Sequence, residues 1–60
     1  MPYVNIRVAG KLSRKQKKNI VKGVTKVIAK EAKKPEAAIL IMIDELPREN
    51  IAKSGKLLDD

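Results

Sequence analysis

The chain begins with a strict alternation of apolar and polar positions. Val4, Ile6 and Val8 fall on one face of an extended segment, and polar or aromatic residues take the other face. This period of two is typical of a half-buried β-strand, so we predict a strand over residues 3–8. Gly10 then breaks the alternation and ends the strand.

A helical pattern follows this strand. Ser13 and Gln16 have the Ser-x-x-Gln spacing of a capping box, which predicts a helix that begins at Ser13 and is ended by Lys34-Pro35. Within it, apolar residues recur at helical spacing: Ile20, Val24, Val27 and Ile28, with Val21 at the margin. One face of the helix should therefore pack against a sheet.

A second strand is predicted by the continuous apolar run over residues 38–43. The run is too short for another full helix and is rich in β-branched residues, as in a strand that is covered on both faces. Pro47 ends this strand. The tail over residues 48–58 contains Ser54-Gly55, which indicates a turn followed by a short hairpin or a terminal strand.

Strand, helix and strand in this order predict a β-α-β unit of the α/β (α+β) class. A crossover of this length joins parallel strands with a right-handed connection. We expect residues 1–60 to form a single domain, since no repeat or linker interrupts the chain. One helix cannot cover both faces of the second strand, and a domain of 60 residues without cysteine or histidine has neither disulfides nor zinc to support it. Oligomerisation is therefore expected to complete the sheets.

The composition excludes several classes of enzyme. Without histidine or cysteine, the chain has no serine–histidine or cysteine–histidine nucleophile and no histidine-based metal site. Adjacent Asp44 and Glu45 should point to opposite faces of a strand end, where we expect solvated charges rather than a paired-carboxylate site. The remaining possible proton carriers are a lysine, Tyr3 and the amino terminus of the chain.

Pro2 gives that amino terminus a special chemistry. Removal of Met1, which is usual before so small a residue, would leave Pro2 with a secondary amine at the start of a strand. An apolar pocket and nearby cations would lower the pKa of this amine towards neutrality, where it is an effective general base. Taken alone, a proline here also suits the start of an edge strand.

Several short motifs occur in an order that resembles the 4-oxalocrotonate tautomerase family. They are Met1-Pro2 entering an alternating strand, the helix start with Gln16, Glu45 after the second strand, Asn50 and Gly55-x-Leu57. The resemblance covers nearly the whole chain. It implies a β-α-β subunit that dimerises through its sheet, with three dimers usually forming a hexamer. It also implies that the terminal proline shuttles a proton between enol and keto forms of a small, carboxylate-bearing substrate without a cofactor.

The chain departs from this family at the positions that usually bind the substrate. Leu12 and Leu40 stand where members typically carry arginines, and Ile51 stands where they often have an aromatic residue. Cations that would replace the arginines are Lys11, Arg48 and Lys53, although each also suits an exposed loop charge. Leu40 and Ile51 would line an apolar wall of the substrate site.

The net charge of +7 is concentrated on the predicted helix. Ten of the 14 basic residues lie between Lys11 and Lys34, and six share one arc: Lys15, Lys18, Lys22, Lys26, Lys30 and Lys33. This lysine face is interpreted as a solvated surface, as a means of steering anionic substrates, or as a site for nucleic acid. Lys17 and Glu31 fall within or beside the apolar stripe, which hints at partners across a subunit contact.

The alternative function is that of a non-catalytic basic oligomer that binds nucleic acid or another polyanion. A single aromatic residue and the lack of a recognised binding motif argue against nucleic acid. The chain has no apolar run long enough for a membrane span and no signal-peptide pattern at its start, so we expect a cytoplasmic protein.

Overall fold

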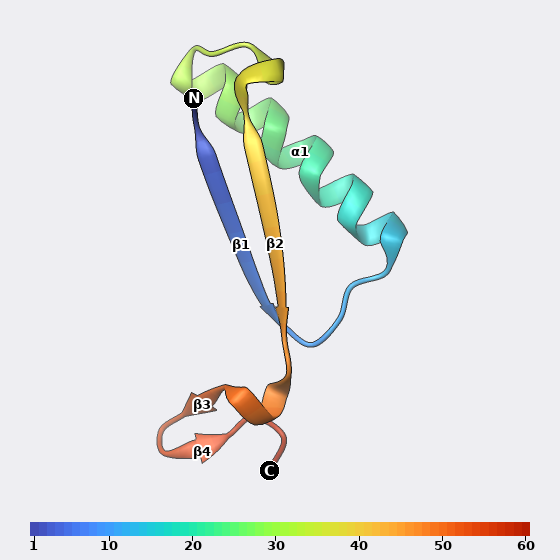
Figure 1. The fold of residues 1–60 in the computed structure, drawn as a ribbon, viewed down its shortest axis with the longest axis vertical. Helices are drawn as coiled ribbons and strands as arrows, with labels where there is room; N and C mark the ends of the chain where they lie inside the picture. Colours follow the sequence, from blue (N-terminus) through green and yellow to red (C-terminus); the bar gives the residue numbers. More distant parts are fainter.

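The computed structural model describes residues 1–60, and its body is a β-α-β unit. Strands β1 (Tyr3–Ala9) and β2 (Leu40–Leu46) run parallel, with Val4 opposite Ile41 and Ile6 opposite Ile43. Helix α1 (Arg14–Ala32) joins them and lies over one face of the pair (Figure 1). The predicted order and direction of these elements are confirmed.

The capping box fixes the start of α1 as predicted. The Gln16 N–H donates to Ser13 Oγ over 3.1 Å, and the Ser13 N–H donates to Gln16 Oε1 over 2.8 Å. At the other end, Lys33 adopts a left-handed conformation with φ of 55°, and its N–H donates to the Ala29 carbonyl. The helix therefore ends at Ala32, just before the predicted Lys34-Pro35 stop.

Strand β2 is shifted towards the C-terminus from the predicted 38–43 segment. Ala38 belongs to a 3₁₀ turn, η1 (Glu36–Ala38), in which the Ile39 N–H donates to the Glu36 carbonyl over 3.2 Å. The strand then continues to Leu46, because β1 offers a partner at every position as far as Ala9. Pro47 ends it as predicted.

The tail forms the hairpin that was one of the two predicted outcomes. After η2 (Arg48–Asn50), strands β3 (Ala52–Lys53) and β4 (Lys56–Leu57) pair antiparallel. The two turn residues, Ser54 and Gly55, have φ of 53° and 80°, as a tight two-residue hairpin requires. The hairpin extends beyond the end of the parallel sheet, away from α1 (Figure 1).

Helix α1 covers one face of the parallel sheet, and the other face is exposed. On the face towards α1, the side chains of Val4, Ile6 and Ile43 are half-buried. On the other face, nothing in the subunit covers Tyr3, Leu40 or Met42, which are 69%, 47% and 40% exposed. The second strand is apolar on both faces, but its own subunit covers only one of them.

The isolated subunit has no buried core. None of its 60 residues is buried, and its accessible surface is 4992 Å², against about 3,900 Å² for a compact protein of this mass. Its radius of gyration is 14.4 Å, where about 10 Å is typical of this length. The excess of roughly 1,100 Å² exceeds the ~800 Å² that each partner buries in a standard interface. Both the accessible surface and the radius of gyration support the expectation of an oligomer.

None of the helices has the length and the apolar content that a bilayer span needs.

A subunit without a core should unfold when it dissociates, which makes its thermal stability depend on concentration. We expect the Tm to rise steadily between about 1 μM and 100 μM protein, because mass action favours the folded assembly. Circular dichroism melts over this range would measure the effect. A Tm that stays constant over the range would show that the monomer is stable by itself.

Candidate functional site

Pro2 lies at the first position of the sheet and is held there through its backbone. Its carbonyl accepts a hydrogen bond of 3.0 Å from the Leu40 N–H, so the parallel ladder extends back to Pro2. The side chain of Pro2 is half-buried, whereas Met1 is 74% exposed. Pro2 and Leu40, two of the residues predicted for the site, are therefore neighbours in one subunit.

The other predicted residues lie at the opposite end of the sheet. Lys11 follows β1, Arg48 opens η2, and Ile51 and Lys53 belong to the hairpin segment (Figure 1). Six residue steps along β1 separate the two ends by roughly 20 Å. One subunit therefore does not bring Pro2 together with any of its predicted cationic partners.

A hollow of about 320 Å³ lies at this far end, lined by Gly10, Lys11, Glu45, Leu46 and Pro47. It forms where the loop after β1 passes the end of β2, and the Gly10 N–H donates to the Leu46 carbonyl over 2.8 Å. Of the predicted cations, only Lys11 lines it. The structure also groups no three Asp or Glu side chains in the manner of a metal site.

The Glu45 carboxylate holds the loop that carries Lys11 in place. Its Oε2 accepts the Leu12 N–H over 2.7 Å, and its Oε1 lies 2.7 Å from Lys17 Nζ. The hydrogen bond from Lys17, and after it that from the Leu12 N–H, lowers the pKa of the Glu45 carboxyl. The ionised carboxylate thus connects the end of β2, the loop and the first turns of α1.

These contacts correct two predictions from the sequence. Glu45 is not a solvated strand-end charge, because it lies on the same sheet face as Val8 and so points towards α1. Lys17, whose place in the apolar stripe hinted at a partner across a subunit contact, pairs with Glu45 of its own chain. The signal was present in the sequence: a lysine in the apolar stripe of a helix and a glutamate on the helix-facing side of a strand.

Asp44 takes the opposite face, as the alternation predicted. Its Oδ2 accepts a hydrogen bond of 3.2 Å from Asn5 Nδ2 and lies 3.5 Å from Arg7 Nε. Both partners stand on the uncovered face of β1. Asp44 and Glu45 therefore serve two separate contacts, and no paired-carboxylate site exists in the subunit.

Comparison with known proteins identifies the family of this fold. The family model described as tautomerase enzyme matches residues 2–60. The chain belongs to the tautomerase family. A curated relative, the 2-hydroxymuconate tautomerase of Bacillus subtilis (strain 168), is 32% identical over 60 residues, which are 100% of this chain and 97% of the relative.

Solved structures of the tautomerase family have the same fold. The crystal structure of YwhB, a homologue of 4-oxalocrotonate tautomerase, has a TM-score of 0.93 at 30% identity and covers 98% of this chain and 97% of its own. A heterohexameric 4-oxalocrotonate tautomerase from Chloroflexus aurantiacus J-10-fl also has a TM-score of 0.93, at 20% identity over 100% of this chain and 97% of its own. At that identity the second likeness is one of fold. The resemblance to the 4-oxalocrotonate tautomerase family is thus confirmed.

The Glu45 contacts predict a specific dependence of stability on pH. A carboxyl whose pKa is lowered by folding stabilises the protein above its unfolded pKa of about 4.3, and this contribution is lost as the pH falls through the lower, folded pKa. Glu45→Gln should therefore lower the Tm most at pH 7, and its difference from the wild type should shrink below about pH 4. Thermal melts between pH 3 and pH 7 would measure this.

Glu49→Gln provides the matched control, since Glu49 lies exposed in η2. Its Tm should follow that of the wild type across the same pH range. A Glu45→Gln difference as large at pH 3 as at pH 7 would contradict the role of the ionised carboxylate.

Proposed function

We propose that this protein is a cofactor-independent tautomerase that interconverts enol and keto forms of a small, carboxylate-bearing substrate. Pro2 is its general base once Met1 has been removed, and residues 1–60 act as a single domain. The observation that carries the proposal is the position of Pro2, whose carbonyl is fixed by Leu40 in the parallel ladder while Met1 is exposed to solvent. Membership of the tautomerase family supports the class of reaction.

The reaction needs only a base that can hold and return a proton. A neutral secondary amine at Pro2 would accept the hydroxyl proton of an enol, and the resulting ammonium would return a proton to the carbon as the keto form appears. No electron is transferred to or from the protein. The ring of Pro2 also fixes its amine more rigidly than a lysine stem would, which favours a repeatable geometry.

The substrate site is proposed to be shared between subunits of a homo-oligomer. Pro2 and Leu40 of one subunit would meet Lys11, Arg48, Lys53 and Ile51 of a neighbour, because the two groups lie at opposite ends of each sheet. The cations would hold the substrate carboxylate, and Leu40 and Ile51 would form its apolar wall. A dimer or a hexamer built as a trimer of dimers is proposed, and a fold relative named as a heterohexamer supports the higher assembly.

The proposal is tested first at Pro2. We expect Pro2→Ala to lower kcat for ketonisation of a simple enol acid by about 10²-fold or more, because general-base catalysis typically contributes this much. Intact-mass measurement of each preparation would show that Met1 is absent. Pro35→Ala replaces a proline that the proposal does not place in the site, five residues before Leu40 at the start of η1, and should keep wild-type kcat. Equal rates for processed Pro2→Ala and wild type would contradict the assignment of the base.

A second candidate function rests on the lysine face. Its six lysines, Lys15, Lys18, Lys22, Lys26, Lys30 and Lys33, are exposed and have no carboxylate within ion-pair distance. The first turn of α1 also lacks an acidic residue that would complement the helix dipole. From Lys15 to Lys33 the face extends along α1 for roughly 27 Å. This uncompensated charge favours a phosphate backbone as partner, contacted without base readout.

Salt dependence distinguishes nucleic-acid binding from a merely solvated face. We expect Lys22→Gln combined with Lys26→Gln to weaken binding of a mixed-sequence DNA duplex and to reduce the slope of log K against log salt by about two. Fluorescence anisotropy between 50 and 200 mM salt would measure it. Lys53→Gln combined with Lys56→Gln removes the same charge from the hairpin, which lies away from α1 (Figure 1), and should leave the slope nearer to that of the wild type. Undetectable binding by the wild type at 50 mM salt would refute the second candidate.

A further inference from the structure

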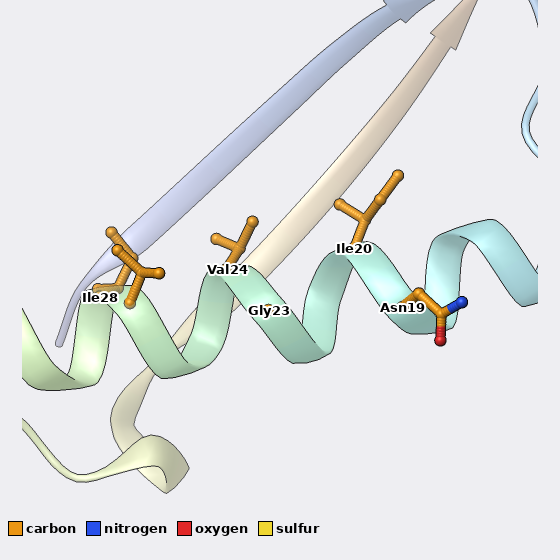
Figure 2. A pocket seen from close by; sticks show the side chains of 6 residues that line it. Asn19, Ile20, Gly23, Val24 and Ile28 are labelled. Carbon is orange, nitrogen blue, oxygen red and sulfur yellow. The ribbon is translucent and has the colours of Figure 1, made fainter.

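Two hollows of the subunit differ in the charge of the residues that line them. The larger one follows α1, has a volume of about 400 Å³ and is lined by Asn19, Ile20, Gly23, Val24, Val27 and Ile28. Figure 2 shows the apolar side chains of Ile20, Val24 and Ile28 along it, and none of its lining residues carries a charge. The hollow at the end of β2 is lined by Lys11 and is therefore the one that suits a carboxylate.

Lys11 is held through its two neighbours in the chain, while its ammonium has no partner in the subunit. The Gly10 N–H donates to the Leu46 carbonyl over 2.8 Å, and the Leu12 N–H donates to Glu45 Oε2 over 2.7 Å. Lys11 itself is exposed and has no carboxylate within ion-pair distance. A cation on a fixed backbone loses less freedom when it binds an anion than a cation on a mobile loop does.

Glu45 carries the one negative charge among the residues that line this hollow. An unpaired carboxylate there would attract the Lys11 ammonium and repel the carboxylate of a substrate. Both oxygens of Glu45 are occupied, however, since Lys17 Nζ lies 2.7 Å from Oε1 and the Leu12 N–H donates to Oε2. Lys17 does not line the hollow, so its contact is with Glu45 and not with a ligand.

We propose that Lys17 is a positioning residue for the reaction: by pairing with Glu45, it keeps the Lys11 ammonium free to bind the substrate carboxylate. This inference rests on the proposed function and deepens it, because it selects Lys11 from the three predicted cations. The two lysines and Glu45 together carry one net positive charge, and removal of Lys17 leaves no net charge. The substrate carboxylate then loses its attraction to the hollow.

Both lysines interact with Glu45, but unequally. The hydrogen bond from Lys17 is the largest cause of the lowered pKa of Glu45, and the charge of Lys11 is the smallest of the causes that lower it. Lys11 therefore lies near enough to interact with this carboxylate without being paired with it. Without Lys17, we expect the Lys11 ammonium to turn towards Glu45 and away from a substrate.

Replacement of Lys17 by methionine keeps an apolar stem and removes the charge. We expect Lys17→Met to raise KM for a simple enol acid about tenfold, the usual effect of losing one hydrogen bond to a charged group, with kcat within about twofold of the wild type. Lys17→Arg retains the ion pair and should keep the wild-type KM. Arg14→Met is the matched control, because Arg14 is exposed in the first turn of α1 and has no ion pair. Its KM should stay near that of the wild type.

A double variant separates this role from a purely structural one. Lys17→Met combined with Glu45→Gln removes both charges of the pair, so Lys11 again has no competing carboxylate and the group again carries one positive charge. We expect the KM of the double variant to return towards the wild-type value. If Lys17 served only to hold the loop, the double variant would bind substrate as weakly as Lys17→Met or more weakly. That result, or a wild-type KM for Lys17→Met, would overturn the proposal.

Binding without turnover separates the inference from the proposed catalysis. Isothermal titration calorimetry of the assembled Pro2→Ala protein with 2-oxobutanoate measures the Kd of a keto acid in the absence of the proposed base. In this background Lys11→Gln and Lys17→Met should each raise Kd about tenfold, whereas Lys17→Met combined with Glu45→Gln should not. Far-ultraviolet circular dichroism would show that each variant is folded.

The two proposals fail in different ways. If this order of Kd values holds while Pro2→Ala retains the kcat of the wild type, the assignment of the base is wrong and the positioning role of Lys17 stands. If 2-oxobutanoate does not bind, or binds equally to all folded variants, the positioning role is overturned even where Pro2 is confirmed as the base. Lys11→Gln leaves the pair of Lys17 and Glu45 intact, so it tests the selected cation even if the double variant does not fold.

Discussion

The structure depends on one constraint: a two-stranded sheet with apolar side chains on both faces has a single helix to cover it. The face towards α1 is half-buried, while Leu40 and Met42 remain exposed on the other. No residue is fully removed from water, so the hydrophobic stabilisation that normally dominates folding is incomplete in one subunit. The elongated shape of the subunit and the distance between Pro2 and the predicted cations are both expected if the subunit is one part of an assembly.

Polar contacts supplement the incomplete hydrophobic stabilisation of the subunit. They fix the geometry of the loop after β1. Glu45 receives a backbone N–H from Leu12 and the ammonium of Lys17 on its two oxygens. Because this carboxylate is only partly exposed, each contact replaces water that it would otherwise hold. The loop with Lys11 is therefore positioned by a charge on β2 as well as by the capping box at Ser13.

Local patterns in the sequence predicted the order and type of the main elements. The exact start of β2 and the contacts of the charged side chains depend on residues far apart in the sequence. The alternation from Val4 to Val8 and the Ser13 cap gave β1 and the start of α1, since both signals are contained within a few residues. The start of β2 could not be placed, because Ala38 and Ile39 are as apolar as the strand and only the pairing with β1 excludes them. The pairing of Glu45 with Lys17 joins positions 28 residues apart, and the separation of Pro2 from Arg48, which follows β2, depends on the parallel direction of the strands.

The parallel direction of β1 and β2 has a consequence for the counting of sites. Each subunit carries Pro2 at one end of its sheet and Arg48, which follows β2, at the other, so under the proposal it would contribute halves of two different sites. In the proposed shared site, an open row of subunits would leave one unmatched half at each end, whereas a closed ring or dimer would match them all. Closure of the assembly would thus determine how many complete sites a given number of chains provides.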